Sequence, residues 1–493
     1  MARALMFQGT GSDVGKSVLV AGLCRAARNR GIAVLPFKPQ NMSNNAAVAD
    51  PGSDGMSGEI GRAQWLQALA SGVAASVHMN PVLLKPQSDN GSQLVVQGKV
   101  HGTARARDYQ AMKPELIQAV MQSFYRLGQQ ADLILVEGAG SPAEINLRAG
   151  DIANMGFATR AGVPVVLVGD IDRGGVIASL VGTHAILPAQ DRAMIAGFVI
   201  NKFRGDQSLF DEGLAAITRF TGWRSFGVLP FIDAVRRLPA EDSVALEKNI
   251  SGSFGKRVKI AVPVLGRIAN FDDLDPLANE TEVELVFVRR GEHLPKDAAM
   301  VILPGSKATI ADLAELRANG WEADLARHRK AGGHIFGICG GYQMLGSAVL
   351  DPDGIEGNVR QIDGLALLDV ETVIAGTKVV RNSTAVLKDG NLPLEGYEIH
   401  MGRSFGGDCA RPMILIDGRP DGAISADGKV FGCYLHGIFG SGAFRKRLLA
   451  SLGARSDGAS HRASVEAALD ELAASIEHSL DVDLLFAEAK TSA

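Results

Sequence analysis

A glycine-rich loop near the N-terminus constrains the fold more than any other feature of the sequence. The loop, Gly9–Ser17, follows the apolar run Ala4–Phe7 and precedes a segment with helical spacing, Ser17–Arg30. Glycines allow backbone N–H groups to turn inward around an anion, and a helix N-terminus adds partial positive charge. A strand, such a loop and a helix in this order predict a phosphate-binding site at the carboxyl end of a parallel strand.

Two residues at the end of the loop carry the expected chemistry. Lys16 is expected to reach the outer phosphates of a nucleotide, and the Ser17 hydroxyl is expected to bind Mg²⁺. The spacing differs from the common form, because Gly9 and Gly15 enclose five residues instead of four, and Gly11 and Gly15 enclose three. The alternative is a glycine-rich turn with an accidental Gly-Lys-Ser, but the flanking strand and helix favour the phosphate loop.

Short apolar runs alternate with longer helical segments along most of the chain. Continuous apolar strands between helices indicate parallel sheets covered on both faces. The polar segment 232–256 interrupts this alternation, and a second alternating series follows it. We therefore expect an α/β protein of two domains, each with a mostly parallel sheet flanked by helices. The expected division is a first domain at 1–231, a connection at 232–256, a second domain at 257–445 and a helical tail at 446–493.

Individual elements follow from the same pattern. Runs of buried-type residues predict strands, and spacing of about 3.6 residues predicts helices. The further expected strands are Ala33–Phe37, Leu133–Val136, Val163–Val168, Ile195–Ile200, Lys259–Val264, Val283–Val288, Met300–Leu303 and His334–Ile338. The further expected helices are Glu115–Gln129 and Ala463–Leu480.

Composition excludes several classes of function. The chain has 50 Lys and Arg residues against 54 Asp and Glu residues, so it lacks the basic excess of a broad nucleic-acid-binding surface. No apolar run reaches the roughly 18 residues that a membrane span requires, and the N-terminus lacks signal-peptide features. The four cysteines form no CxxC pair, and sparse cysteine fits a reducing compartment. We expect a cytoplasmic protein that acts on small molecules, with no nucleic-acid or membrane partner and an oligomeric state that the sequence leaves open.

A second candidate site centres on Cys339. This residue lies in Gly-Ile-Cys-Gly-Gly, between an apolar strand and a helix, which is typical of a nucleophile on a sharp turn. The helix N-terminus favours the thiolate. The N–H of Gly340 is placed to contact an oxyanion, and Gly305, at the end of a neighbouring strand, is placed to supply a second donor. A buried structural cysteine is the alternative, against which the flanking glycines argue.

The cysteine motif resembles that of the class I glutamine amidotransferases. The resemblance implies that Cys339 attacks the side-chain amide of glutamine, forms a thioester and releases ammonia, with His436 as base and then acid. The usual His-x-Glu is absent, because the third position here is Ile438. This implies a Cys–His dyad, or an orienting group from elsewhere in the chain. Glu398 and His400 are candidates for that group, although ordinary strand residues are the simpler interpretation.

The phosphate loop resembles that of dethiobiotin synthetase and related carboxylate-activating ligases. The resemblance implies ATP and Mg²⁺ as cofactors. It places Lys38 near the phosphates, Glu137 on Mg²⁺ and Asn201 against the adenine, each after an apolar strand. Surface charge at a strand end is the alternative for the lysine and the glutamate. The implied nucleotide-binding residues are Thr10, Gly11, Gly15, Lys16, Ser17, Lys38 and Asn201, and the implied metal ligands are Ser17 and Glu137.

Over nearly its full length the chain resembles the glutamine-dependent, cobyrinate-amidating family of cobyric acid synthases. The resemblance implies amidation of the b, d, e and g carboxylates of adenosylcobyrinic acid a,c-diamide, with corrinoid, glutamine and ATP as small-molecule partners. The segments that carry it are Lys38–Asn45, Glu59–Gln64, Asn80–Gln87, Glu137–Asn146 and Asp170–Gly175.

A dense run of amides at Gln40–Asn45 suits such a substrate. Amide side chains both donate and accept, so they are able to bind a carboxylate or an amide that has already formed. We expect Asn41 and Asn44 to bind the substrate, with a polar, turn-rich loop as the alternative. Asp151, just beyond the Glu137 segment, is expected near the reacting carboxylate or the metal.

Two other functions share parts of this pattern. A cobyrinic acid a,c-diamide synthase or a cell-wall-precursor amidating enzyme would have the same Cys–His domain, but the Asn-rich run and the segment Gly138–Pro142 argue against both. Partition-type switch ATPases have variant phosphate loops of this kind. A cysteine elbow has no role in a switch ATPase, so this alternative is the more distant one.

Overall fold

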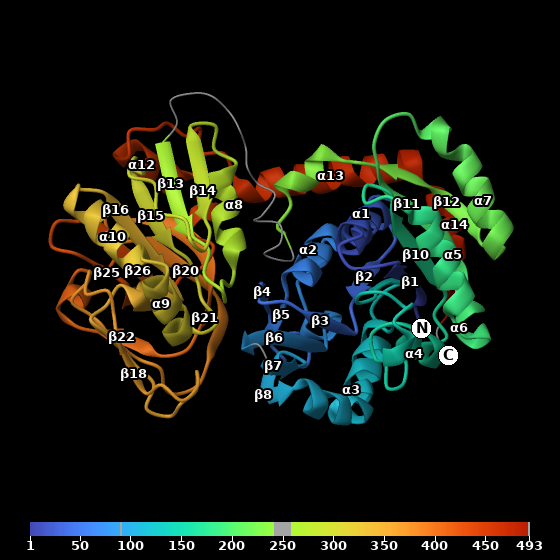
Figure 1. Ribbon diagram of the computed structural model, residues 1–493, viewed down its shortest axis with the longest axis horizontal. Coiled ribbons are helices and arrows are strands. Elements are labelled where there is room, and N and C mark those ends of the chain that lie inside the picture. Colours follow the sequence, from blue (N-terminus) through green and yellow to red (C-terminus); the bar gives the residue numbers. More distant parts are fainter. Residues whose placement is uncertain (89–90, 241–257, 492–493) are drawn as a thin grey trace. The chain divides into compact units, whose positions relative to one another are not determined.

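The computed structural model describes residues 1–88, 91–240 and 258–491 of the chain, and these fall into two compact units (Figure 1). The first unit contains residues 1–43, 49–240 and 465–491, and the second contains residues 44–48 and 258–464. Most of the C-terminal segment that we expected as a separate tail therefore folds with the first unit. Residues 241–256 of the expected connection lie outside the described residues.

A parallel sheet forms the centre of the first unit. Its strands are arranged in the order β12-β11-β10-β1-β9-β2, and every neighbouring pair is parallel. All residues of β2, β9 and β10 are buried, which is why these strands are continuous apolar runs in the sequence. The strands are β1 (Arg3–Gly9), β2 (Val34–Phe37), β9 (Leu133–Glu137), β10 (Val165–Asp170), β11 (Ile195–Phe203) and β12 (Arg224–Pro230), and β27 (Lys490–Thr491) pairs antiparallel with β1.

Helices cover both faces of this sheet. On one face, apolar residues of α1, α2, α13 and α14 share a core with β1, β9 and β10. On the other face, Phe124 of α3 and Phe157 of α4 pack around Phe37 of β2. Figure 1 shows α5 and α7, in green, beside the strands β10 to β12. The helices are α1 (Lys16–Asn29), α2 (Arg62–Ser71), α3 (Ala106–Leu127), α4 (Met155–Ala161), α5 (Val176–Ile186), α6 (Ala189–Arg192), α7 (Asp211–Thr221), α13 (His461–Ser479) and α14 (Val482–Ala487).

A second, smaller sheet in the first unit was not predicted from the sequence. It has the order β3-β6-β7-β8, in which β3 and β6 are parallel and the other pairs are antiparallel. Its strand β3 contains the first residues of the amide-rich run. The strands of this region are β3 (Gln40–Met42), β4 (Ala46–Ala49), β5 (Gly58–Gly61), β6 (Val82–Ser88), β7 (Gly91–Val96) and β8 (Lys99–Arg105).

The second unit is built around another mostly parallel sheet. Its order is β14-β13-β15-β16-β26-β25, and only β25 runs antiparallel to its neighbour. The predicted strands at Val283–Val288, Met300–Leu303 and His334–Ile338 are confirmed with these bounds. The strands are β13 (Val258–Pro263), β14 (Val283–Val288), β15 (Met300–Leu303), β16 (His334–Ile338), β25 (Ala423–Ile424) and β26 (Val430–Cys433).

Two four-stranded sheets and five helices complete the described part of the second unit. The sheets have the orders β18-β17-β19-β22 and β21-β20-β23-β24. Their strands are β17 (Ala348–Leu350), β18 (Gln361–Asp363), β19 (Glu371–Val373), β20 (Val379–Leu387), β21 (Leu392–His400), β22 (Arg403–Phe405), β23 (Ile414–Ile416) and β24 (Arg419–Asp421). The helices are α8 (Asp275–Ala278), α9 (Thr309–Ala318), α10 (Trp321–Lys330), α11 (Gly340–Met344) and α12 (Gly442–Ser451).

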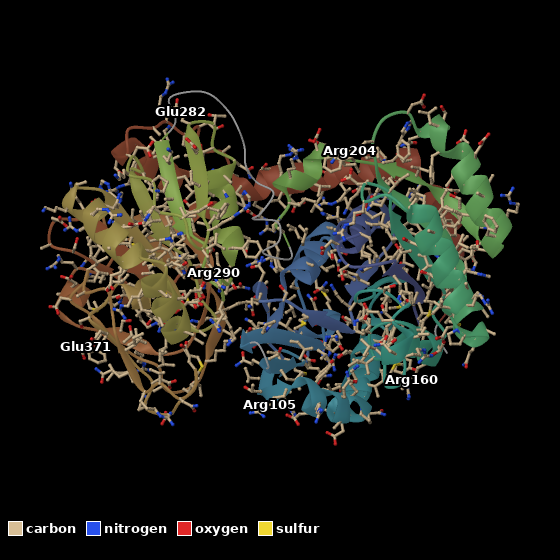
Figure 2. All side chains as sticks on the ribbon, viewed as in Figure 1. Arg105, Arg160, Arg204, Glu282, Arg290 and Glu371 are labelled. Carbon is tan, nitrogen blue, oxygen red and sulfur yellow. The ribbon has the colours of Figure 1, made fainter. Side chains whose placement is uncertain are left out.

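Acidic and basic side chains occur together on both units. In Figure 2, blue nitrogen and red oxygen atoms are interspersed around each unit, consistent with 50 basic and 54 acidic residues. None of the described helices has the length and apolar character needed to cross a membrane.

Candidate active sites

The phosphate loop makes a tight turn between β1 and α1. Gly15 has a φ of 91°, a left-handed conformation that favours glycine, and a Cβ at this position would collide with the carboxamide of Asn201. The N–H of Thr10 donates to the carbonyl oxygen of Val168 over 3.0 Å, which ties the loop to β10. Helix α1 begins at Lys16, so its N-terminus, with its partial positive charge, lies at the end of the loop, as in an anion-binding site.

The side chain of Lys16 lies over the loop. Its Nζ donates to the carbonyl oxygens of Gly11 and Gly140, each at 3.2 Å. Gly140 follows β9, so the lysine bridges the loop and the segment that carries Glu137. This places the ammonium where the outer phosphates of a nucleotide would lie.

The carboxylate of Glu137 brings the other predicted phosphate-site residues together. Its Oε1 accepts hydrogen bonds from Ser17 Oγ at 2.7 Å and from Lys38 Nζ at 2.8 Å. Its Oε2 accepts from Gln67 Nε2 at 2.7 Å and from Gln64 Nε2 at 3.4 Å. Glu137 is only 1% exposed. The Ser17 hydroxyl oxygen and a Glu137 carboxylate oxygen thus lie beside the Lys38 ammonium, at the carboxyl ends of β2 and β9.

The side-chain oxygens of Ser17 and Glu137 are of the type that suits Mg²⁺. This cation prefers oxygen ligands and is usually held by one or two protein groups, with phosphates and water completing its shell. Ser17 Oγ and Glu137 Oε1 are oxygen atoms of this kind and lie within hydrogen-bond distance of each other. The described residues contain no cluster of three or more His, Cys, Asp or Glu side chains that would form an all-protein metal cage.

Asn201 holds the loop from the neighbouring strand. Its Nδ2 donates to the carbonyl oxygen of Val14 over 2.8 Å, and its side chain is the one that abuts Gly15. The next residue, Lys202, has a φ of 63° and donates from Nζ to Asp170 Oδ2 over 2.8 Å. The expected contact of Asn201 with adenine remains a prediction, but its contact with the loop is evident.

The three expected substrate-binding residues occupy different surroundings. Asn41 is 3% exposed, and its Nδ2 donates to Gln64 Oε1 over 3.0 Å. Asn44 packs with the second unit, where its buried Oδ1 has no hydrogen-bond partner among the described residues. The Asp151 carboxylate accepts from the backbone N–H groups of residues 153, 154 and 156, so it stabilises the turn that leads into α4.

The nucleophile elbow has the backbone that the sequence predicts. Cys339 lies between β16 and α11 with a φ of 52° and a ψ of −109°, an unfavourable conformation for a residue with a side chain. Gly341 is packed so closely against the carbonyl group of Leu303 that a Cβ there would collide with it. The Sγ of Cys339 lies 3.6 Å from the carbonyl oxygen of Ile399.

The predicted oxyanion residues lie close to the elbow. Gly340 is the first residue of α11, so its N–H has no partner within the helix. A Cβ on Gly340 would lie 2.8 Å from Ser306 N, and a Cβ on Gly305 would lie 3.1 Å from Cε1 of His436. The structure thus brings Gly305, Gly340 and His436 into one place beside the cysteine.

The group that orients His436 comes from a distant part of the sequence. Nδ1 of His436 lies 2.7 Å from Oδ2 of Asp273, and the N–H of Gly437 donates to Oδ1 of the same carboxylate over 2.6 Å. His436 and Asp273 are 2% and 4% exposed. The ring of His436 also stacks on Tyr397, with centroids 5.1 Å apart. The three groups Cys339, His436 and Asp273 form a triad.

The electrostatics of the triad favour a charged imidazole. Burial by itself disfavours the charge, but the carboxylate of Asp273 and the neighbouring Cys339 outweigh this effect and raise the pKa of His436 to about 10. A protonated His436 between a carboxylate and a sulfur is the arrangement that stabilises a thiolate nucleophile.

The earlier candidates for the orienting group have other partners. The Glu398 carboxylate accepts from Arg381 Nε at 2.6 Å and from Ser383 Oγ at 2.9 Å. His400 stacks on Tyr434, with ring centroids 4.0 Å apart. Burial would raise the pKa of Glu398, but its hydrogen bonds with His400, Arg381 and Ser383 lower it to about 2. The structure therefore assigns the orienting contact to Asp273.

Sequence reasoning did not find Asp273, Gln64 or Gln67 as site residues. Asp273 lies in a short 3-10 helix after β13, and no motif links it to a histidine 163 positions later. Gln64 and Gln67 are both 0% exposed and lie three positions apart on α2. Two buried amides at this spacing on one helix face are a usable signal, because buried amides need polar partners.

Comparisons with known proteins identify the two kinds of domain. Residues 5–245 match the CobQ/CobB/MinD/ParA nucleotide binding domain, and residues 259–444 match the CobB/CobQ-like glutamine amidotransferase domain. A protein of Sinorhizobium fredii named cobyric acid synthase is 68% identical over 98% of this chain and 98% of its own length. Proteins with the same name from Brucella suis and Mesorhizobium japonicum are 67% and 66% identical over 99% of this chain and 100% of their own lengths.

Proposed function

Because the chain belongs to the cobyric acid synthase family, we propose that it amidates the b, d, e and g carboxylates of adenosylcobyrinic acid a,c-diamide to give adenosylcobyric acid. The chain is a ligase with a glutamine amidotransferase domain and a nucleotide-binding domain. The proposal is supported most by one observation: Glu137 gathers Ser17 and Lys38 beside the phosphate loop, in the chain that also carries the Cys339–His436–Asp273 triad.

The triad supplies the ammonia. The sulfur of Cys339 attacks the side-chain carbonyl carbon of glutamine, and the N–H groups of Gly340 and Gly305 hold the oxyanion. His436 gives its proton to the leaving nitrogen, so that ammonia departs and a thioester remains. Water, losing a proton to His436, then releases glutamate and restores the thiol. Asp273 fixes the tautomer of His436 throughout, because its carboxylate accepts from Nδ1.

The phosphate loop activates the carboxylate. An oxygen of the corrinoid carboxylate attacks the γ-phosphorus of ATP, ADP departs and an acyl phosphate forms. Ammonia then attacks the acyl carbon, phosphate departs and a proton is lost to give the amide. Lys16 and Lys38 are placed to stabilise the charge on the transferring phosphoryl group. Mg²⁺, when bound, neutralises part of the same charge, and Ser17 and Glu137 are the residues that would hold it.

The residues expected to meet the substrate are consistent with this scheme. The Oδ1 of Asn44 is a buried acceptor that no described residue satisfies, and a buried group of this kind usually finds a partner. We propose that Asn44 donates to or accepts from a corrinoid side chain, and that Asn41 and Asp151 fix the backbone around the reacting carboxylate.

The experiment that tests the proposal follows both the product and the oxygen atoms. The protein is incubated with ATP, Mg²⁺, glutamine and the diamide substrate with ¹⁸O in its carboxylates. The corrinoid mass is expected to change in four steps, and one ¹⁸O atom is expected in the released phosphate for each amide formed. An unchanged corrinoid with continuing glutamine hydrolysis would contradict the assigned substrate, and phosphate without ¹⁸O would contradict the acyl phosphate.

A further inference from the structure

The side chain of Lys113 lies on the buried face of α3. Leu116, Val120 and Phe124 follow Lys113 on that face and are 4%, 0% and 1% exposed. Lys113 itself is only 8% exposed, at a position where the helical pattern calls for an apolar residue. The predicted helix began at Glu115, so this position fell outside the expected element.

The ammonium of Lys113 has no paired counter-charge among the described residues. It lies 5.5 Å from the ring centroid of Tyr109, one helical turn away. Among the residues that the structure describes, no side chain or carbonyl group forms a hydrogen bond or an ion pair with it. Burial lowers the pKa of Lys113, and the charge of Asp151 opposes this effect only in part. The stem of Lys113 is buried, whereas its Nζ is not one of the buried polar atoms that lack a partner. The ammonium is therefore accessible to an anionic ligand, which would supply the counter-charge that the described residues do not supply.

The neighbours of Lys113 do not neutralise its ammonium. Gly150 lies alongside the lysine stem, where a Cβ would be 3.9 Å from Lys113 Cδ. The oxygens of Asp151 are occupied by backbone N–H groups. The hydroxyl of Tyr109 donates to the Oε1 of Gln40, at the start of β3. An aromatic ring and an ammonium of α3 and an amide of β3 therefore form one cluster.

Two series of contacts connect this cluster to the phosphoryl-transfer site. In the first, Asn41 follows Gln40 and donates to Gln64, whose Nε2 in turn contacts Glu137. In the second, Asp151 accepts from the N–H of Asn154, and the Oδ1 of Asn154 accepts from the N–H of Ala139, two residues after Glu137. The surroundings of Lys113 are thus linked to the Glu137 carboxylate by these two series of contacts.

We propose that Lys113 binds a carboxylate of the acidic small-molecule substrate and holds it beside the phosphate loop, with Tyr109 and Gln40 completing the subsite. This inference rests on the proposed function, because it names the group that recognises the substrate of that reaction. A carboxylate satisfies the ammonium, whereas the amide that replaces it after reaction carries no charge. The subsite therefore binds unreacted positions more tightly than reacted ones, which helps to retain the substrate until amidation is complete.

The test compares the affinity for the substrate, which carries carboxylates, with the affinity for the product, which carries amides in their place. Equilibrium dialysis, followed by the visible absorption of the corrinoid, gives Kd for the diamide substrate and for cobyric acid, in which those carboxylates are amides. For Lys113→Met, we expect Kd for the substrate to rise about 10- to 100-fold, as for a lost hydrogen bond to a charged group. Kd for cobyric acid, KM for ATP and the glutaminase rate are expected to change less than about threefold. Lys113→Arg, which keeps the charge, should preserve most of the preference for the acid.

Lys99→Met is the matched control, since Lys99 is an exposed lysine of the same unit. Equal weakening of acid and amide binding would mean that Lys113 only supports the fold, and a change in KM for ATP alone would mean that it binds a phosphate. Either result contradicts the proposal. If Lys113→Met does not fold, Lys113→Gln is measured in its place. If the wild type neither binds nor amidates the corrinoid, the proposed function fails. If it does both and Lys113→Met keeps the acid preference, only this inference fails.

Discussion

Nδ1 of His436 lies 2.7 Å from a carboxylate oxygen of Asp273, although 163 positions separate the two residues in the chain. The carboxylate sits on the first turn after Asn270, a residue with a φ of 53° whose Nδ2 donates to the Tyr397 hydroxyl over 2.9 Å. Tyr397 in turn stacks on His436. The imidazole is therefore held at its edge by Asp273 and on its face by Tyr397.

Replacing the orienting carboxylate should separate ammonia production from amidation. For Asp273→Asn, we expect kcat of glutamine hydrolysis to fall about 100-fold or more, because an amide does not stabilise the imidazolium or fix its tautomer. Amidation with added ammonium chloride should stay near the wild-type rate. Glu398→Gln serves as the comparison. If it slowed glutamine hydrolysis more than Asp273→Asn did, the assignment of the triad would be wrong.

The same pair predicts how stability depends on pH. The pKa of His436 is raised to about 10 in the folded protein, against a usual value near 6.5 when unfolded. The folded state therefore holds the proton more tightly, and this contribution to stability is complete below pH 6.5 and is lost as the pH rises through about 10. Urea unfolding of the second unit between pH 6 and 10 should show this decline, and His436→Gln should show less of it. Identical pH profiles would refute the raised pKa.

The two glutamines on α2 should control metal binding through Glu137. Gln67 Nε2 lies 2.7 Å from Glu137 Oε2, so it fixes the carboxylate with its other oxygen, Oε1, toward Ser17, the second proposed metal ligand. We expect Gln67→Met to weaken Mg²⁺ activation of ammonia-dependent amidation by about 10- to 100-fold, the usual effect of losing a partner of a metal ligand. Excess Mg²⁺ should restore the rate. Gln118→Met, at an exposed position of α3, should leave the Mg²⁺ dependence unchanged.

Replacing Asn201 distinguishes between two roles of its side chain, support of the phosphate loop and contact with adenine. Its hydrogen bond to Val14 O predicts that Asn201→Ala loosens the phosphate loop and raises KM for ATP and for GTP by a similar factor of about 3 to 10, as for a lost neutral hydrogen bond. A contact with adenine would instead make ATP lose more than GTP. Initial rates of amidation with each nucleotide decide between these outcomes.

Most of the secondary structure around the sites was accessible from the sequence, because buried parallel strands are continuous apolar runs. The strand predicted at Leu133–Val136 is β9 (Leu133–Glu137), and the helix predicted at Ser17–Arg30 is α1 (Lys16–Asn29). The prediction of a two-domain α/β fold is confirmed. The sheet β3-β6-β7-β8 was missed, because its short strands mix polar and apolar residues and carry no clear period.

Site residues could be predicted from the sequence alone only where a local motif contains them. Lys16, Ser17 and Cys339 lie in turns whose glycines mark them, whereas the neighbours of Asp273 and Lys113 are brought close only by the fold. Spacing along the chain contains no information about a contact over 163 positions. Lys113 was missed for a different reason: the predicted helix was too short, since α3 begins at Ala106 and not at Glu115.

The division of labour between the two sites is the central claim, and one variant tests it most directly. Cys339→Ala is incubated with ATP, Mg²⁺ and the diamide substrate, with either glutamine or ammonium chloride as the nitrogen source, and the corrinoid mass is followed with time. The account predicts no amidation with glutamine and stepwise amidation at close to the wild-type rate with ammonium chloride. Amidation from glutamine by this variant, or none from ammonia while the protein remains folded and binds ATP, would contradict it.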